Sequence, residues 1–129
     1  MSERGAASVV MAAVAGFVML LAVALISVAG LQQARLRATT AADAAALAAA
    51  PVTFLPFGAA GTPTQEAARF ARFNGASLIS CRCPTDRSFA PRTAAVTVRV
   101  SIDVPLLGVV AVEATGRAVF VPAALLEGV

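Results

Sequence analysis

The chain has 129 residues, enough for one ordinary domain beside a membrane segment. Hydrophobic residues make up 59% of it and charged residues only 13%, a balance typical of membrane proteins rather than of small soluble domains. The net charge of +3 is scattered, which excludes the clustered basic face that nucleic-acid binding needs. The chain also lacks His, Lys, Trp and Tyr. Because Ser–His, Cys–His and Ser–Lys pairs cannot form, we expect no catalytic residue, metal site, cofactor or small-molecule substrate.

The first predicted element is an apolar helix near the N-terminus. No charged residue occurs from Gly5 to Leu31, and about 20 residues suffice to span a bilayer. We therefore expect a short leader at residues 1–5 and a transmembrane helix at residues 6–31. Val28-Ala29-Gly30 is similar to a signal-peptidase site, so cleavage there is an alternative, although the apolar run is longer than that of a usual signal peptide.

The helix is predicted to continue out of the membrane over residues 32–50. No Gly or Pro occurs from residue 31 to residue 50, and Pro51 is the first stop signal. One helix over residues 6–50 would be roughly 68 Å long, about twice the thickness of a bilayer core. The projecting part has a polar stripe at Gln32, Arg35, Thr39 and Asp43. Its other face has small residues that let a second backbone approach closely, at Ala34, Ala38, Ala41, Ala42, Ala45 and Ala49.

A loop is predicted at residues 51–63, followed by a small α+β domain at residues 64–129. Thr62 and Pro63 are a favourable start for a second helix. Asn74-Gly75 is a favourable end, because both residue types accept a positive φ. Residues 76–80 are compatible with a short strand, and residues 81–91 look like a polar turn.

Two strands are predicted to form an antiparallel hairpin near the C-terminus. In Thr93–Val104 apolar and polar residues alternate, which is typical of a half-buried strand. The residues expected to point inward are Val96, Val98, Val100 and Ile102. Val109–Val121 repeats the pattern more weakly, with Gly116 as a candidate bulge. The connection is centred on Leu106-Leu107-Gly108. A lone hairpin is marginal in water, so it must pack on one of the helices.

The two cysteines, Cys81 and Cys83, are separated by one residue. In an extended chain their Cα atoms would be about 6.5–7 Å apart, at the edge of bridging range, and a tight turn would bring them closer. A disulfide, two free thiols and bonds to a partner are all open at this point. Ordinary solvation is the preferred account of the arginines around the second helix and the following loop, and a basic adhesive or lipid-facing patch is the alternative. These are Arg69, Arg72, Arg82, Arg87 and Arg92.

The pattern Glu3-Arg4-Gly5-Ala6-Ala7-Ser8-Val9 before a long apolar helix resembles the TadE/TadG-like proteins. These are minor pilin-like components (pseudopilins) of the tight-adherence (Flp, type IVc) pilus systems. The alanine run at residues 41–50 is the most specific match, and residues 73–81 resemble an actinobacterial-type branch of the group. A helix-favouring filler is the alternative explanation of the alanine run.

The resemblance implies a non-enzymatic, pilin-like α+β subunit held in the inner membrane by its N-terminal helix. Its partners would be other pilin-like subunits and pilus assembly membrane proteins. It also implies a prepilin-peptidase junction at Gly5-Ala6. The residues that it assigns to the family motif are Asp43, Leu47, Asn74 and Gly75.

The chain departs from the family pattern at Val10, where type IV pilins carry the Glu that compensates a neighbour's amino terminus. Relatives in the branch also often have a cysteine near Thr62-Pro63-Thr64, where this chain has none. The alternative is therefore a static single-pass anchor that binds a partner through its alanine-rich helix. Ordinary solvation on the polar stripe is the preferred account of Asp43, because exposed ion pairs contribute little. The alternative is that Asp43 orients subunit packing toward an arginine of a neighbour.

We expect the C-terminal domain to lie outside the cytoplasm. Arg35 and Arg37 after the membrane helix mildly oppose this orientation under the positive-inside rule. However, the tail is longer than the roughly 60 residues over which that rule holds, and paired cysteines fit an oxidising compartment.

Overall fold

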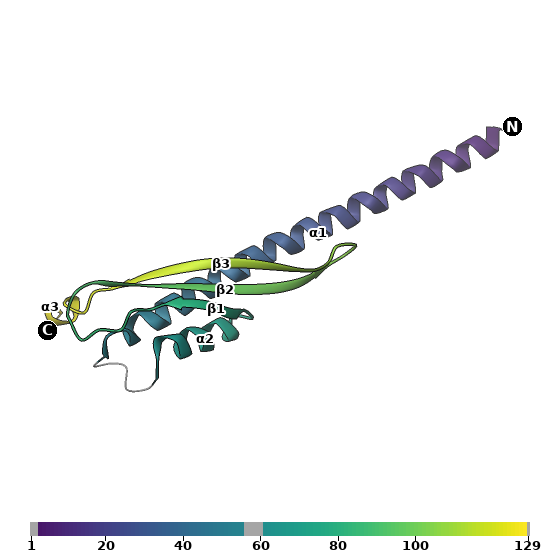
Figure 1. Ribbon diagram of the computed structural model, residues 1–129. Coiled ribbons are helices and arrows are strands. Elements are labelled where there is room, and N and C mark those ends of the chain that lie inside the picture. The colour runs from purple at the N-terminus through teal and green to yellow at the C-terminus, as the bar shows by residue number, and fades with distance from the viewer. Residues whose placement is uncertain (1–2, 56–60, 129) are drawn as a thin grey trace.

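The computed structural model describes residues 3–55 and 61–128, and it shows a long helical rod with a small domain on its C-terminal half (Figure 1). The elements are α1 (Glu3–Val52), α2 (Pro63–Phe73), β1 (Ser77–Arg82), β2 (Arg92–Val104), β3 (Gly108–Phe120) and α3 (Ala124–Glu127). The predicted α+β class is confirmed. The four-residue helix α3 has no counterpart in the prediction.

Helix α1 is continuous for 50 residues and extends past both predicted ends. A glycine costs a helix only about 1 kcal/mol, so Gly16 and Gly30 do not break it. The expected leader at residues 1–5 is helical from Glu3 onward, and residues 1–2 lie outside the described residues. The helix also passes through Pro51, because a proline in the last turn removes only one backbone donor. The Thr53 hydroxyl then donates to the carbonyl of Ala50 at 2.6 Å.

The loop predicted at residues 51–63 therefore begins at Thr53, and its residues 56–60 lie outside the described residues. Helix α2 begins at Pro63, as expected. The Thr62 hydroxyl accepts from the Gln65 amide at 3.2 Å, and the Gln65 side chain accepts from the Thr62 amide at 3.0 Å. This reciprocal capping box satisfies two backbone donors at the start of the helix. At the other end only Gly75 has a positive φ, of 72°, since Asn74 has φ −96°.

The sheet has three antiparallel strands in the order β1-β2-β3. The predicted hairpin is confirmed. Of its predicted inward residues, Val96, Val98 and Val100 are buried and Ile102 is half-buried against the core. Strand β1 runs further than expected and includes Cys81 and Arg82, which the sequence left in a turn. Strand β1 lies at the edge of the sheet and pairs with β2, and the register of this pairing shifts between Leu78 and Ser80.

Gly116 is not a bulge, contrary to the expectation. It pairs in regular register with Val96. A Cβ atom at this position would lie 2.5 Å from the backbone C and O atoms of Ala42 and 2.7 Å from the Asp43 amide nitrogen. The glycine is therefore required by the close approach of β3 to α1, and not by an irregular strand.

Helices α1 and α2 cover one face of the sheet, and the hairpin runs alongside α1 toward its N-terminal half (Figure 1). The other face is exposed and polar. There Arg99 contacts Glu113 at 2.6 Å, and the hydroxyls of Thr97 and Thr115 are 2.8 Å apart. One face of the sheet thus forms the core with the helices, and the other faces away from them.

Candidate functional site

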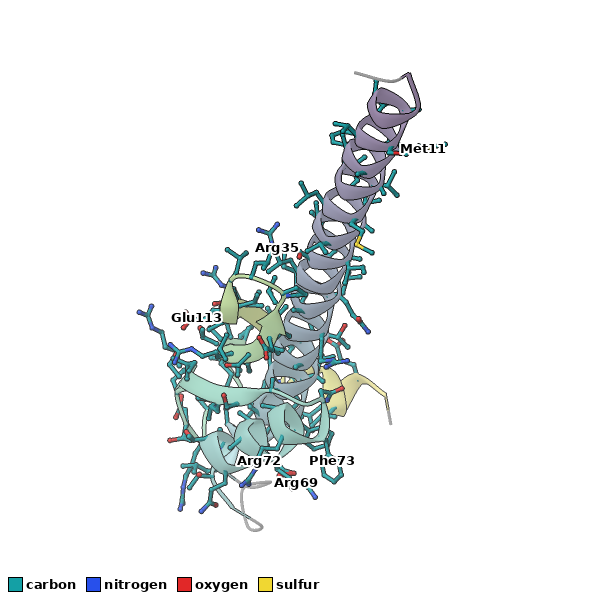
Figure 2. The ribbon with its side chains drawn as sticks, turned by 90° about the vertical axis from the view of Figure 1, so that its right-hand side faces the viewer. Met11, Arg35, Arg69, Arg72, Phe73 and Glu113 are labelled. Carbon is teal, nitrogen blue, oxygen red and sulfur yellow. A yellow bond between two sulfur atoms is a disulfide. The ribbon has the colours of Figure 1, made fainter. Side chains whose placement is uncertain are left out.

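Helix α1 has two halves with opposite surroundings. Every residue from Gly5 to Ala22 is exposed, including large apolar side chains such as Met11, Phe17 and Leu20 (Figure 2 labels Met11). Of the described helices, α1 alone is long and apolar enough to cross a membrane. From Ala34 onward one side of the same helix is buried in the domain. The change from an exposed apolar rod to a packed core helix is the main structural feature of α1.

The predicted small-residue face is buried in this chain's own domain. All six alanines named from the sequence are at most 2% exposed, and Ala46 and Ala50 extend the face. They pack with buried residues of α2, β2 and β3, among them Ala71, Val98 and Ala118. This face is therefore not free to bind a partner, which removes the contact on which the static-anchor alternative depended.

The polar stripe of α1 stays outside the core. Gln32, Arg35, Thr39 and Asp43 are all exposed, and the Thr39 hydroxyl donates to the carbonyl of Arg35 at 3.0 Å. Among the described residues, no cation lies within ion-pair distance of Asp43. Leu47 of the alanine run is also exposed. Arg35 and Thr39 also line a shallow groove with residues 110–114 of β3. The stripe and Leu47 are exposed, so their side chains are accessible to another molecule.

A shallow groove lies between α1 and the C-terminal end of α2. It is lined by Gln33, Leu36, Arg37, Thr40, Phe73, Asn74 and Gly75. Leu36 is 70% exposed and Phe73 is 78% exposed, so the groove carries two exposed apolar side chains framed by polar ones. Figure 2 shows Phe73 beside Arg69 and Arg72 on α2. Asn74 and Gly75, which the family resemblance selected, thus form part of this groove and the turn after α2.

Arg92 is buried, so it does not belong to the solvated set of arginines in which the sequence placed it. Its guanidinium donates to the backbone carbonyls of Thr53 at 2.9 Å and Asp86 at 2.8 Å, and also to that of Ser88. It lies 5.7 Å from the centre of the Phe54 ring. Arg92 therefore joins the end of α1 to the loop that precedes β2, a role that no sequence pattern indicated.

The same loop is held by Asp86. Its carboxylate accepts from the hydroxyl of Ser88 at 2.5 Å and from the amides of Ser88 at 3.2 Å and Arg87 at 2.6 Å. These hydrogen bonds, led by the Ser88 hydroxyl, lower the pKa of Asp86 below its usual 3.8. Backbone bonds between Asp86 and residues 53 and 55 complete the junction with the end of α1.

Cys81 and Cys83 are joined in a disulfide, which selects one of the three alternatives left open by the sequence. Their Cα atoms are 5.4 Å apart, closer than in an extended chain. Among the described residues, no group of three or more His, Cys, Asp or Glu side chains could hold a metal ion.

The remaining arginines and the peptidase junction lie at the surface. Arg69 pairs with Glu66 on α2 at 2.5 Å, while Arg72, Arg82 and Arg87 are exposed. Gly5 and Ala6 are exposed within the first turns of α1. No protein-family model, curated protein or solved structure matches the chain.

Proposed function

We propose that this protein is a membrane-anchored structural subunit, a minor pseudopilin of the TadE/TadG-like kind, and not an enzyme. The N-terminal half of α1 would anchor it in the inner membrane. The domain of residues 61–128 would lie outside the cytoplasm and contact other pilin-like subunits and assembly proteins of a tight-adherence pilus or a related secretion filament.

The observation that carries this proposal is the division of α1. An exposed apolar surface as long as Gly5–Ala22 is unstable in water and requires lipid or other helices around it. The C-terminal half of the same helix forms the spine of a domain through its alanines. A rigid rod that belongs to both regions suits a subunit that is stored in a membrane and packs with its neighbours through helices.

The surface of the domain supports a binding role. The exposed residues of α1 opposite the alanine face are continuous with the groove at Leu36 and Phe73. A neighbouring subunit could cover this apolar surface, since exposed apolar groups framed by polar residues are typical of protein contacts. The disulfide supports a location in an oxidising compartment.

The proposal is tested by the mass of the N-terminus of the protein purified from its own cells. Cleavage between Gly5 and Ala6 supports the pilin route. An intact start at Met1 or Ser2 would contradict the pilin route and support a static anchor, which would then have to bind its partner through a surface other than the buried alanine face. Cleavage near Gly30 would refute both, because it would release the domain from the membrane.

The orientation is tested separately with a membrane-impermeant thiol reagent applied to intact, wall-stripped cells after reduction. Labelling of Cys81 and Cys83 without permeabilisation is expected. Labelling only after permeabilisation would put the domain in the cytoplasm and would contradict the pilin proposal.

A further inference from the structure

The turn of the β2–β3 hairpin presents apolar side chains with no protein cover. Leu106 is 90% exposed, Leu107 is 70% exposed and Val109 is 76% exposed. No charge occurs between Asp103 and Glu113. A hairpin turn in water normally carries Gly, Asn, Asp or Ser, so two exposed leucines are unexpected there.

The backbone of the turn strengthens this observation. Leu106 has φ 69° and is the one non-glycine residue with a positive φ among the described residues. The Leu107 amide donates to the carbonyl of Val104 at 3.1 Å and closes the turn. Glycine or asparagine fits such a position with less steric conflict than leucine. The chain thus keeps a large apolar side chain where the backbone favours a small or polar one.

The hairpin lies along α1, so the height of its turn on the helix can be derived. Gly116 of β3 touches the backbone of Ala42, and Val110 lines one groove with Leu31. The interval from Gly116 to Val110 along β3 is about 20 Å at the usual rise of a strand, and the interval from Ala42 to Leu31 along α1 is about 16 Å at the usual rise of a helix. Strand β3 and helix α1 therefore run side by side over this stretch. Leu106 lies about four strand residues beyond Val110, which matches about eight helix residues beyond Leu31. The turn is therefore level with Val23.

Burial along α1 agrees with this position. Val23 and Ser27 are half-buried, whereas the preceding residues from Gly5 to Ala22 are all exposed. Figure 1 shows the turn beside α1, well along the helix toward its N-terminus. The hairpin thus extends beyond the domain and onto the part of α1 that the membrane would enclose.

The charge-free part of α1 extends from Gly5 to Ala34. A span of about 20 residues fits in this segment in several positions, and each of them contains residues 15–24. Val23 is thus inside the span wherever the membrane is placed. Asp103 and Glu113 on the hairpin, and Gln32 and Arg35 on the helix, mark where charged and polar groups resume on both elements.

We propose that the turn of the hairpin, with Leu106, Leu107 and Val109, enters the boundary between lipid headgroups and acyl chains beside α1. The inference rests on the membrane anchoring proposed above, and its occupant is bilayer lipid. The charge at Asp103 restricts the contact to a depth of about 5–10 Å, as for other interfacial elements. The protein would then contact the bilayer at two points, the rod and the turn, which would restrict its tilt relative to the membrane.

The chain contains no Trp or Tyr, so one introduced tryptophan is a unique fluorophore. Three full-length variants are compared in phosphatidylcholine–phosphatidylglycerol vesicles: Leu106→Trp at the turn, Met19→Trp in the span and Val119→Trp at the far end of β3. Met19 and Val119 are both exposed, so neither substitution disturbs the core. Lipids brominated in the acyl chains quench from the membrane, and acrylamide quenches from water. Leu107→Trp repeats the measurement if Leu106→Trp does not fold.

We expect brominated lipid to lower the emission of the Leu106→Trp and Met19→Trp variants about twofold, as for a ring at or below the headgroup level. The Val119→Trp variant should respond only to acrylamide. If only Met19→Trp responds to brominated lipid, the anchor stands and the inference fails. Quenching of the Leu106→Trp variant by acrylamide would then show that the turn lies in water. Protection of this variant from both quenchers would show that a second copy of the protein covers the turn. If Met19→Trp does not respond either, the proposed anchoring fails as well.

Discussion

Replacing Gly116 with alanine tests whether the domain depends on the close contact between strand β3 and helix α1. The new methyl group would lie 2.5 Å from the backbone of Ala42, and the strand or the helix would have to move by about 0.9 Å to restore an ordinary 3.4 Å contact. Backbone atoms of a long helix cannot rotate away as a side chain can. Overpacking of this kind costs about 1–3 kcal/mol.

For a domain of this size about 2 kcal/mol lowers Tm by about 8–16 °C. The measurement is thermal unfolding of the full-length protein in detergent micelles, followed by the β-sheet signal in infrared spectroscopy. Gly16→Ala is the matched control, because nothing lies within 4 Å of a Cβ atom there. Adding Ala42→Gly should not rescue Gly116→Ala, since the conflict is with the backbone of Ala42. A Tm for Gly116→Ala equal to that of the unmodified protein would refute the packing argument.

Three further outcomes are expected. Val100→Asp should prevent folding of the domain, because Val100 is 2% exposed and the new carboxylate would be buried without a partner. Ser101→Asp on the exposed face should change the free energy of unfolding by less than about 0.5 kcal/mol. Equal protease sensitivity of the two variants would contradict the strand register. Arg92→Met should destabilise the loop before β2 by about 3 kcal/mol, because it removes the hydrogen bonds of the buried guanidinium to Thr53 and Asp86. The measurement is faster proteolysis at residues 83–91. Unchanged cleavage would show that these hydrogen bonds contribute little. The pKa of Asp86 measured by carbon-13 NMR should lie below 3.8. Because the pKa is lower in the folded protein than in the unfolded chain, the contribution of Asp86 to stability is present above pH 3.8 and is lost as the pH falls through the pKa of the folded protein. A midpoint at or above 3.8 would contradict the hydrogen bonding at Ser88.

The parts of the fold that a regular sequence pattern specifies could be predicted from the sequence. The continuity of α1 follows from the lack of breakers over residues 31–50, and the inward face of β2 follows from alternating valines. The alanine face was also visible in the sequence. What covers it was not, because small residues accept a helix, a sheet or another subunit equally well. Only the tertiary structure shows that the sheet and α2 fill it.

Features that depend on a single distant contact could not be predicted. The sequence around Gly116 would look the same if the glycine formed a bulge or if it allowed a helix to approach the strand closely. Which of the two occurs depends on Ala42, which is far away in the chain. Arg92 resembles the other arginines in the sequence, and its burial depends on carbonyls at Thr53 and Asp86 that converge only in the folded chain. Isolated side-chain roles are therefore harder to derive than periodic faces.

The small residues also determine where the rest of the domain lies. Gly116 lets β3 approach the backbone of Ala42 closely, and this contact helps to hold the hairpin along the helix, with its turn level with Val23. A larger residue at this contact would move the turn outward and separate it from the helix surface that the membrane would enclose. The alanine and glycine positions thus have a consequence beyond packing density. They fix the apolar turn and the apolar half of α1 on one side of the molecule, as contact with a single bilayer requires.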